Sequence, residues 1–221
     1  MADYLPALRF KALTPLFDRV VSLTSREATF KQALLDQAGL APGQSVLDLG
    51  AGTGTLAIEA KHRQPDATVV GLDADEQILE LARRKAARSG VDVEFSQGLA
   101  TELPYPDRSF DRVLTTLFFH HLTPGDRRAT LAELVRVMRP GGELHVGDWA
   151  APADALQAAL SWPVRIFDGN ERTRENFSGH LPQLIADAGF ADVEVRREVR
   201  TPLGTIGLLS ATRSGRTHRC G

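Results

Sequence analysis

The chain has 221 residues, of which 43% are hydrophobic and 24% charged. This balance suits one globular domain with its own core. The formal net charge of −2 gives no global field that would attract nucleic acid or an anionic membrane. We expect no stable membrane insertion, because the sequence has no run of about 18 apolar residues. The single cysteine, Cys220, excludes an internal disulfide framework and predicts a cytoplasmic location.

The first segment, residues 1–38, is predicted to be helical, and we interpret 1–40 as a helical cap. Thr24 and Glu27 have the spacing of a capping box, and Gly39 ends the helix.

Short apolar runs then alternate with helical patterns. Strands are predicted at 45–49, 68–72, 91–95, 110–115 and 143–148. Helices are predicted at 55–63, at 76–88, and from a Thr123 cap to a stop at Pro140-Gly141-Gly142. Strands separated by helices indicate parallel βαβ units.

The last third changes in style. Residues 149–172 carry aromatic side chains among small residues and prolines, and are long enough to form a lid. One more helix ends at Gly189, and strands at 193–199 and 203–212 flank a Thr201-Pro202 turn. So short a connection requires an antiparallel hairpin.

The predicted fold class is therefore α/β. We expect a Rossmann-like, doubly wound sheet of seven strands, mostly parallel with one antiparallel strand, and an N-terminal helical cap. A single domain is expected over 1–213, followed by a disordered polar tail at 214–221.

A glycine-rich loop is the most informative motif. The strand Val46-Leu47-Asp48-Leu49 runs into Gly50-Ala51-Gly52-Thr53-Gly54, where glycine permits a sharp turn and a close approach to a ligand. A dinucleotide fingerprint needs its third glycine one residue later, at Thr55. The Asp48 carboxylate would also repel a pyrophosphate and attract the ammonium of a methionyl group. The loop therefore favours a cationic amino-acid cofactor over NAD.

Asp73 ends the second predicted strand, where a carboxylate can accept both hydroxyl protons of a ribose. The alternative role, as N-cap of the next helix, suits Asp75 better.

Four segments in this order resemble class I methyltransferases of the ubiquinone/menaquinone-biosynthesis-like group. They are 46–54, Gly71-Leu72-Asp73-Ala74, 103–111 and 134–144. The resemblance implies S-adenosylmethionine as cofactor. It places the methionyl group near Asp48, Gly50, Ala51 and Gly52, the ribose on Asp73, and adenine near Ala74 and Gly98-Leu99-Ala100. Gln77 and Thr115 are assigned to the same site.

The chain departs from this family at Leu99, where an Asp commonly accepts a hydrogen bond from the adenine amino group. A backbone group or Gln97 must substitute, or cofactor affinity falls, because one missing hydrogen bond costs about 1 kcal/mol.

Methyl transfer from a sulfonium is an in-line displacement, so the protein mainly positions the acceptor. A base helps only where the acceptor carries a proton that must leave. His120 and His121 follow the fourth predicted strand, and His120 is the candidate base; the alternative is that one histidine braces the loop. We expect no metal site, because no Asp, Glu or Cys spacing completes one. The acceptor pocket is expected to include Tyr4, Phe10, Phe17, Trp149, Trp162 and Phe167.

The sequence thus predicts a methyltransferase acting on a small-molecule substrate, with no nucleic acid partner. A catalytically degenerate methyltransferase-like partner or regulatory protein is the alternative, and an NAD-dependent reductase is disfavoured. The acceptor molecule, its acceptor atom and the oligomeric state stay open.

Overall fold

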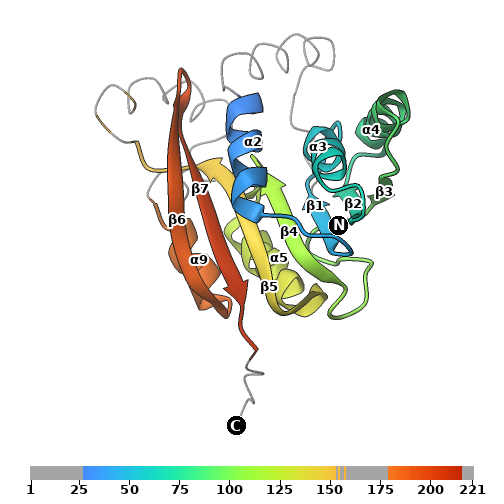
Figure 1. Ribbon diagram of the computed structural model, residues 1–221. Coiled ribbons are helices and arrows are strands. Elements are labelled where there is room, and N and C mark those ends of the chain that lie inside the picture. The colour runs from blue at the N-terminus through green and yellow to red at the C-terminus, as the bar shows by residue number, and fades with distance from the viewer. Residues whose placement is uncertain (1–26, 153, 155–156, 158–178, 216–221) are drawn as a thin grey trace.

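The computed structural model describes residues 27–152, 154, 157 and 179–215. Thr24, Trp162, Phe167, most of the expected cap and lid, and the end of the tail lie outside these residues. A central sheet with helices on both faces makes up the described fold (Figure 1).

The sheet has seven strands in the order β3-β2-β1-β4-β5-β7-β6. Their bounds are Ser45–Leu49 (β1), Thr68–Asp73 (β2), Glu94–Gln97 (β3), Phe110–Thr116 (β4), Met138–Trp149 (β5), Phe190–Thr201 (β6) and Gly204–Arg213 (β7). All neighbouring strands from β3 to β5 are parallel, whereas β7 runs antiparallel to both β5 and β6. The predicted fold class is therefore confirmed, including its single antiparallel strand.

The observed start of β5 differs from the prediction, because hydrogen-bonded pairing with β4 overrides the turn preference of the local sequence. β5 begins at Met138, within the segment expected to close a helix, because Met138 takes an extended conformation and pairs with Phe110. The register then shifts before Arg112 pairs with Glu143, and Gly141 has a φ of 78°. Pro140-Gly141-Gly142 thus forms an irregularity within the strand, where proline and glycine are tolerated.

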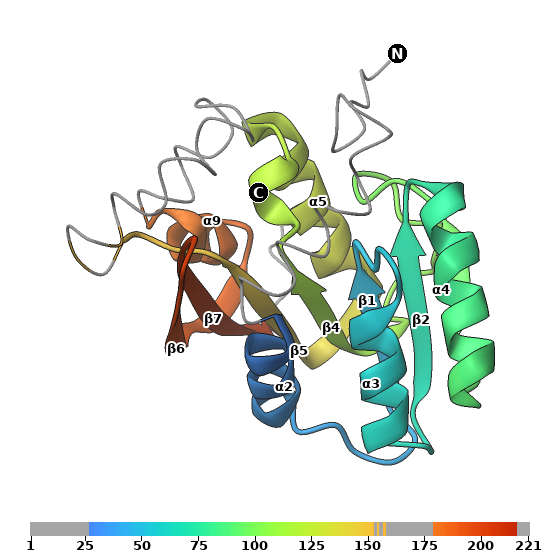
Figure 2. The same cartoon turned by 90° about the horizontal axis from the view of Figure 1, so that it is seen from above.

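Helices cover both faces of the sheet (Figure 2). α2 (Glu27–Ala38), α3 (Thr55–Arg63) and α4 (Glu76–Ser89) pack on one face, and α5 (Pro124–Val137) and α9 (Leu181–Asp187) on the other. A short 3-10 helix, η1, covers Phe119–His121. No helix of the described residues is long and apolar enough to cross a membrane.

The N-cap residues of α4 and α5 are the ones that the sequence predicts. Asp75 accepts a hydrogen bond from the Gln77 amide at the start of α4, and Thr123 accepts one from the Asp126 amide at the start of α5. Each cap satisfies an N–H group that the helix leaves without a partner.

Candidate functional site

The carboxyl ends of β1 to β5 lie along one edge of the sheet, because these strands are parallel. The glycine loop, Asp73, the 97–100 segment and the residues after β4 all follow strands at this edge. Open α/β sheets bind ligands at such an edge. The edge lies at the upper side of Figure 1, where the arrowheads of β4 and β5 point.

The three loop glycines have different surroundings. All three have positive φ, between 53° and 72°. A methyl group on Gly50 would collide with the Phe118 ring, and one on Gly54 would lie 2.6 Å from the Phe95 ring. A methyl group on Gly52 would meet nothing within 4 Å. Gly50 and Gly54 therefore permit packing, whereas Gly52 borders open space that a ligand can enter.

The Asp73 carboxylate is fixed beside this open space. Its Oδ2 accepts a hydrogen bond from the Gly52 amide at 2.9 Å, and its Oδ1 accepts one from the Asp75 amide at 3.1 Å. These two backbone donors set the direction of the remaining lone pairs of the carboxylate. Asp75, rather than Asp73, is the N-cap of α4, as predicted.

Residues assigned to adenine lie next to Asp73. The Gly98 amide donates to the Asp73 carbonyl oxygen, and the Gln97 side-chain amide donates to the Ala74 carbonyl oxygen, each at 3.0 Å. Leu99 is 48% exposed, so its apolar side chain borders the solvent. Gln97 is thus anchored beside Ala74, where its amide oxygen can take over the acceptor role that Leu99 lacks.

Three other assigned residues have different degrees of exposure. Gln77 lies exposed in the first turn of α4. Ala100 is buried, and Thr115 is fully buried with no hydrogen-bond partner for its hydroxyl among the described residues. Thr115 shares a sheet face with Val113, which packs toward α5. The structure therefore places Thr115 at the carboxyl edge of the sheet but, because it is fully buried, not in the open space beside Gly52.

Asp48 is buried beneath the loop. It is 1% exposed, and its Oδ2 accepts a hydrogen bond from the Ala57 amide of α3 at 3.0 Å. Burial raises the pKa of Asp48 to about 7, although the Lys31 charge and the Ala57 amide oppose this shift. A cation at the loop would favour the ionised form. Lys31 of α2 is a charged residue of this region that the sequence analysis missed.

His120 forms a buried pair with Asp148, the last but one residue of β5. His120 is 3% and Asp148 1% exposed, and His120 Nδ1 lies 2.8 Å from Asp148 Oδ1. Asp148 also accepts hydrogen bonds from the backbone amides of His120 and Trp149. Burial raises the pKa of Asp148, but the His120 charge and hydrogen bonds outweigh burial and lower it overall.

Asp148 was also missed by the sequence analysis. The available signal was an acid at the carboxyl end of a predicted strand. The His121 ring lies against that of His120, with centroids 3.8 Å apart. Within the described residues, no group of three or more His, Cys, Asp or Glu side chains is placed to hold a metal ion.

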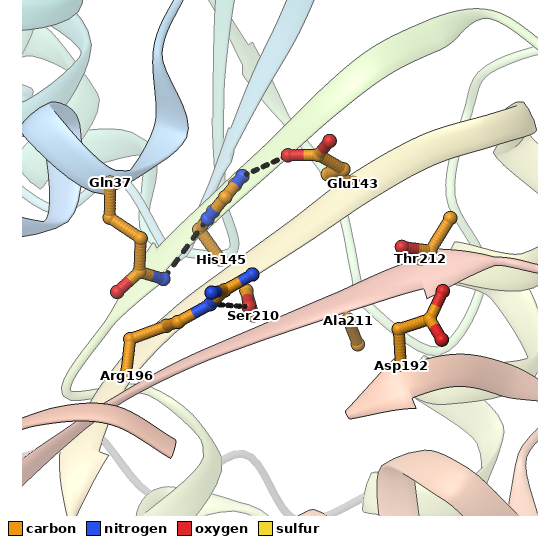
Figure 3. Close-up of a pocket in the computed structure, with 8 residues that line it drawn as sticks. All are labelled: Gln37, Glu143, His145, Asp192, Arg196, Ser210, Ala211 and Thr212. Atoms are coloured by element: carbon orange, nitrogen blue, oxygen red, sulfur yellow. Dashed lines mark hydrogen bonds and ion pairs between the residues drawn. The ribbon is translucent and has the colours of Figure 1, made fainter. Parts of the chain in front are cut away.

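A hollow of about 390 Å³ is lined by residues of α2, β5, β6 and β7 (Figure 3). Its histidine, His145, lies 3.1 Å from Gln37 Nε2 and 3.2 Å from Glu143 Oε2. Burial lowers the pKa of His145 to about 4, despite the Glu143 charge. The neutral ring therefore accepts from Gln37 and donates to Glu143. Both ring nitrogens of His145 therefore have protein partners within the hollow.

Comparisons with known proteins identify the family of the chain. Residues 46–142 match the model of a methyltransferase domain. A demethylmenaquinone methyltransferase of Deinococcus radiodurans is 38% identical over 68% of this chain and 63% of its own length. One of Renibacterium salmoninarum is 30% identical over 86% of this chain and 85% of its own length.

The fold is shared with solved structures. A SAM-dependent methyltransferase from Aquifex aeolicus superposes with a TM-score of 0.62 at 23% identity, over 82% of this chain and 88% of that one. The chain spans just under two thirds of the Deinococcus relative and of a similar Thermus thermophilus protein, 63% and 65% respectively. The sequence motifs, the sheet and these relatives together show that the chain belongs to the class I S-adenosylmethionine-dependent methyltransferases, in the group that includes the demethylmenaquinone methyltransferases.

Proposed function

We propose that this protein transfers the methyl group of S-adenosylmethionine to a small-molecule acceptor. The observation that carries this proposal is the Asp73 carboxylate, fixed by two backbone amides beside the open face of Gly52. A carboxylate oriented in this way suits the two hydroxyl groups of a ribose. The loop then supports the methionyl end of the cofactor, and Ala74 and Gln97 flank the adenine.

The reaction needs little from the protein beyond positioning. The acceptor atom forms a bond to the methyl carbon as the carbon–sulfur bond breaks, and S-adenosylhomocysteine leaves as a neutral thioether. The site must align the acceptor with that bond and exclude water.

His120 is the proposed base where the acceptor loses a proton. A neutral His120 that donates its Nδ1–H to Asp148 has its basic nitrogen at Nε2. Asp148 also stabilises the imidazolium that forms once the proton has moved to His120. The bracing role is the alternative, because the Asp148 contacts also tie η1 to the end of β5.

The names of the relatives point to a first acceptor to test. Demethylmenaquinone carries a ring carbon that loses its proton on methylation in the reduced form, which matches a site with a base. We therefore propose a quinol-type aromatic acceptor. The degenerate partner protein suggested by Leu99 gains no support from the comparisons.

Calorimetry with S-adenosylhomocysteine tests the cofactor site. Asp73→Asn should weaken binding by about 10- to 100-fold, since hydrogen bonds to charged groups contribute about 1.5–3 kcal/mol. Asp75→Asn is the matched control, because asparagine remains a good N-cap, and it should leave affinity within about threefold. Equal affinities for the wild type and both variants would contradict the proposed ribose site.

Mass spectrometry tests the transfer itself. The protein, S-adenosylmethionine and reduced demethylmenaquinone should yield a product heavier by one methylene unit. His120→Gln should lower kcat by about 100-fold or more without weakening S-adenosylhomocysteine binding. Unchanged turnover in His120→Gln would leave His120 with only the bracing role.

A further inference from the structure

We propose that Arg127 is a positioning residue for methyl transfer, which holds the peptide group between Phe119 and His120 and thereby fixes the direction of the His120 ring. This inference rests on the proposed role of His120 as the base. It concerns the acceptor side of the site, and it assigns a polar role to the start of α5, where the sequence predicts only a capped helix.

Arg127 is a buried cation in the first turn of α5. It is 0% exposed and is the largest of the fully buried side chains that the structure describes. Arginine is almost never fully buried unless it is paired, because a charge loses much of its hydration on burial. Other buried positions of α5 are Leu131 and Leu134, which pack in the apolar core. A guanidinium group on this helix face therefore indicates a role that packing alone does not explain.

The Arg127 guanidinium contacts the turn that carries His120. Its Nε donates to the Phe119 carbonyl oxygen at 3.0 Å. The charge on the donor makes such a hydrogen bond stronger than one between neutral groups. The same oxygen accepts from the Leu122 amide at 3.1 Å, in the bond that closes η1. Arg127 thus binds the 3-10 turn at the carbonyl group immediately before His120.

The peptide group between Phe119 and His120 is held at both of its polar ends. Its carbonyl oxygen accepts from Arg127. Its N–H group, which belongs to His120, donates to Asp148 Oδ2 at 3.3 Å, and the other oxygen of Asp148 lies 2.8 Å from His120 Nδ1. Because a peptide group is planar, its rotation would weaken both backbone contacts together. The orientation of the His120 ring therefore depends on Arg127 as well as on Asp148.

The turn needs such contacts because its local structure is weak. η1 has three residues, and the hydrogen bonds of a 3-10 helix have poorer geometry than those of an α-helix. Leu117, just before η1, has a φ of 52°, in the left-handed region that is unfavourable for a side chain with a Cβ atom. Strained backbone persists where surrounding contacts hold it, and Arg127 and Asp148 supply such contacts. Without the Arg127 contact, the turn should relax and the His120 ring should lose its fixed direction.

A purely structural role for Arg127 is the alternative, in which the hydrogen bond only joins α5 to η1. Both roles predict a loss of stability when the guanidinium group is removed. Only the positioning role predicts a loss of kcat in the folded variant with little change in cofactor binding. Only that role also predicts that the loss disappears when His120 is replaced, because residues that act as one unit have non-additive effects.

Turnover with S-adenosylmethionine and reduced demethylmenaquinone tests the proposal, together with calorimetry of S-adenosylhomocysteine binding. Arg127→Met keeps an unbranched apolar side chain but removes the donor, and should lower kcat by about 30- to 100-fold. Its affinity for S-adenosylhomocysteine should stay within about threefold of the wild type, as expected for a residue that acts on the transition state alone.

A conservative variant and a neighbouring residue provide the controls. Arg127→Lys should lower kcat by only about 3- to 10-fold, because an ammonium group can donate to the same carbonyl oxygen but lacks the rigid geometry of the guanidinium group. Arg128 is the next residue and is exposed, so Arg128→Met should keep kcat within about twofold of the wild type.

Each Arg127 variant is also combined with His120→Gln. In that background, Arg127→Met and Arg127→Lys should lower kcat by less than about twofold, since the base that they would misplace is gone. Thermal unfolding identifies any variant that is not folded at the assay temperature. If Arg127→Met does not fold, the loss of kcat in Arg127→Lys and its disappearance beside His120→Gln decide the question.

A wild-type kcat in folded Arg127→Met, or equal losses with and without His120, would overturn the positioning role and leave Arg127 with a structural one. If His120→Gln keeps the wild-type kcat, the base assignment fails, and the positioning role of Arg127 fails with it. A wild-type protein that forms no methylated product is a different result, because it overturns the proposed function and the role of Arg127 together.

Discussion

Replacing Asp48 with asparagine should make the protein more stable at pH 8 while weakening cofactor binding. Asparagine keeps an oxygen that can accept the Ala57 amide hydrogen bond but removes a charge that is 1% exposed. Burial raises the pKa of this carboxyl from 3.8 to about 7. The folded protein therefore binds the Asp48 proton more tightly than the unfolded chain does.

The sign and size of the effect follow from this difference. A raised pKa contributes stability that is fully present below pH 3.8 and is lost as pH rises through about 7. A shift of about 3 pKa units corresponds to roughly 4 kcal/mol at pH 8. The asparagine must bury an NH2 group at a cost of about 1–3 kcal/mol. The net gain should be about 1–3 kcal/mol, or a rise in Tm of roughly 2–10 °C.

Urea unfolding of wild type and Asp48→Asn at pH 5 and pH 8 measures this difference, with the exposed acid variant Asp66→Asn as control. The advantage of Asp48→Asn should appear at pH 8 and vanish or reverse at pH 5, where wild-type Asp48 is protonated. S-adenosylhomocysteine should bind the variant about tenfold more weakly. A stability difference that is the same at both pH values would contradict a raised pKa of Asp48 in the folded protein.

Three more predictions concern the loop and the two buried histidines. Gly54→Ala should cost more than about 2 kcal/mol of stability, because its methyl group meets Phe95 and Ala82 within 3 Å. Gly52→Ala should cost only about 1 kcal/mol of stability. It should nevertheless weaken the binding of S-adenosylhomocysteine to the folded protein, because the new methyl group enters the space that the ligand occupies. Urea unfolding and calorimetry of both variants would separate these effects, and a reversed order would contradict the open face of Gly52. Asp148→Asn should lower kcat by at least tenfold and alter the pH–rate profile, since Asp148 orients His120. A change in stability with an unaltered pH–rate profile would mean that Asp148 only ties η1 to the end of β5. The pKa of His145 is lowered to about 4, so the stability contributed by its neutral ring is full above pH 6.5 and is lost as pH falls through about 4. Between these pH values, the free energy of unfolding of His145→Gln in urea should fall by about 2 kcal/mol less than that of the wild type. An equal dependence of this free energy on pH in both proteins would argue against a neutral buried ring.

The sequence alone determined the element order and the glycine-rich loop, because both depend on local signals. The alternation of apolar strands and helical patterns requires parallel βαβ units. The glycine spacing after Asp48, with Asp73 at the next strand end, specifies a ligand edge without any knowledge of side-chain contacts. The Asp75 and Thr123 caps were also predictable, since each cap bonds an amide only two or three residues away.

Contacts between side chains that are distant in the sequence depend on strand pairing and helix packing. The pairing of His120 with Asp148, 28 residues apart, depends on the register between β4 and β5, and no local pattern carries that register. The same pairing extends β5 back to Met138, against the turn preference of Pro140-Gly141-Gly142. Likewise, the packing of α2 on the sheet lets the charge of Lys31 lower the pKa of Asp48, against the larger effect of burial. Local sequence limits the backbone conformations, but burial and strand pairing between remote segments determine the electrostatics of the site.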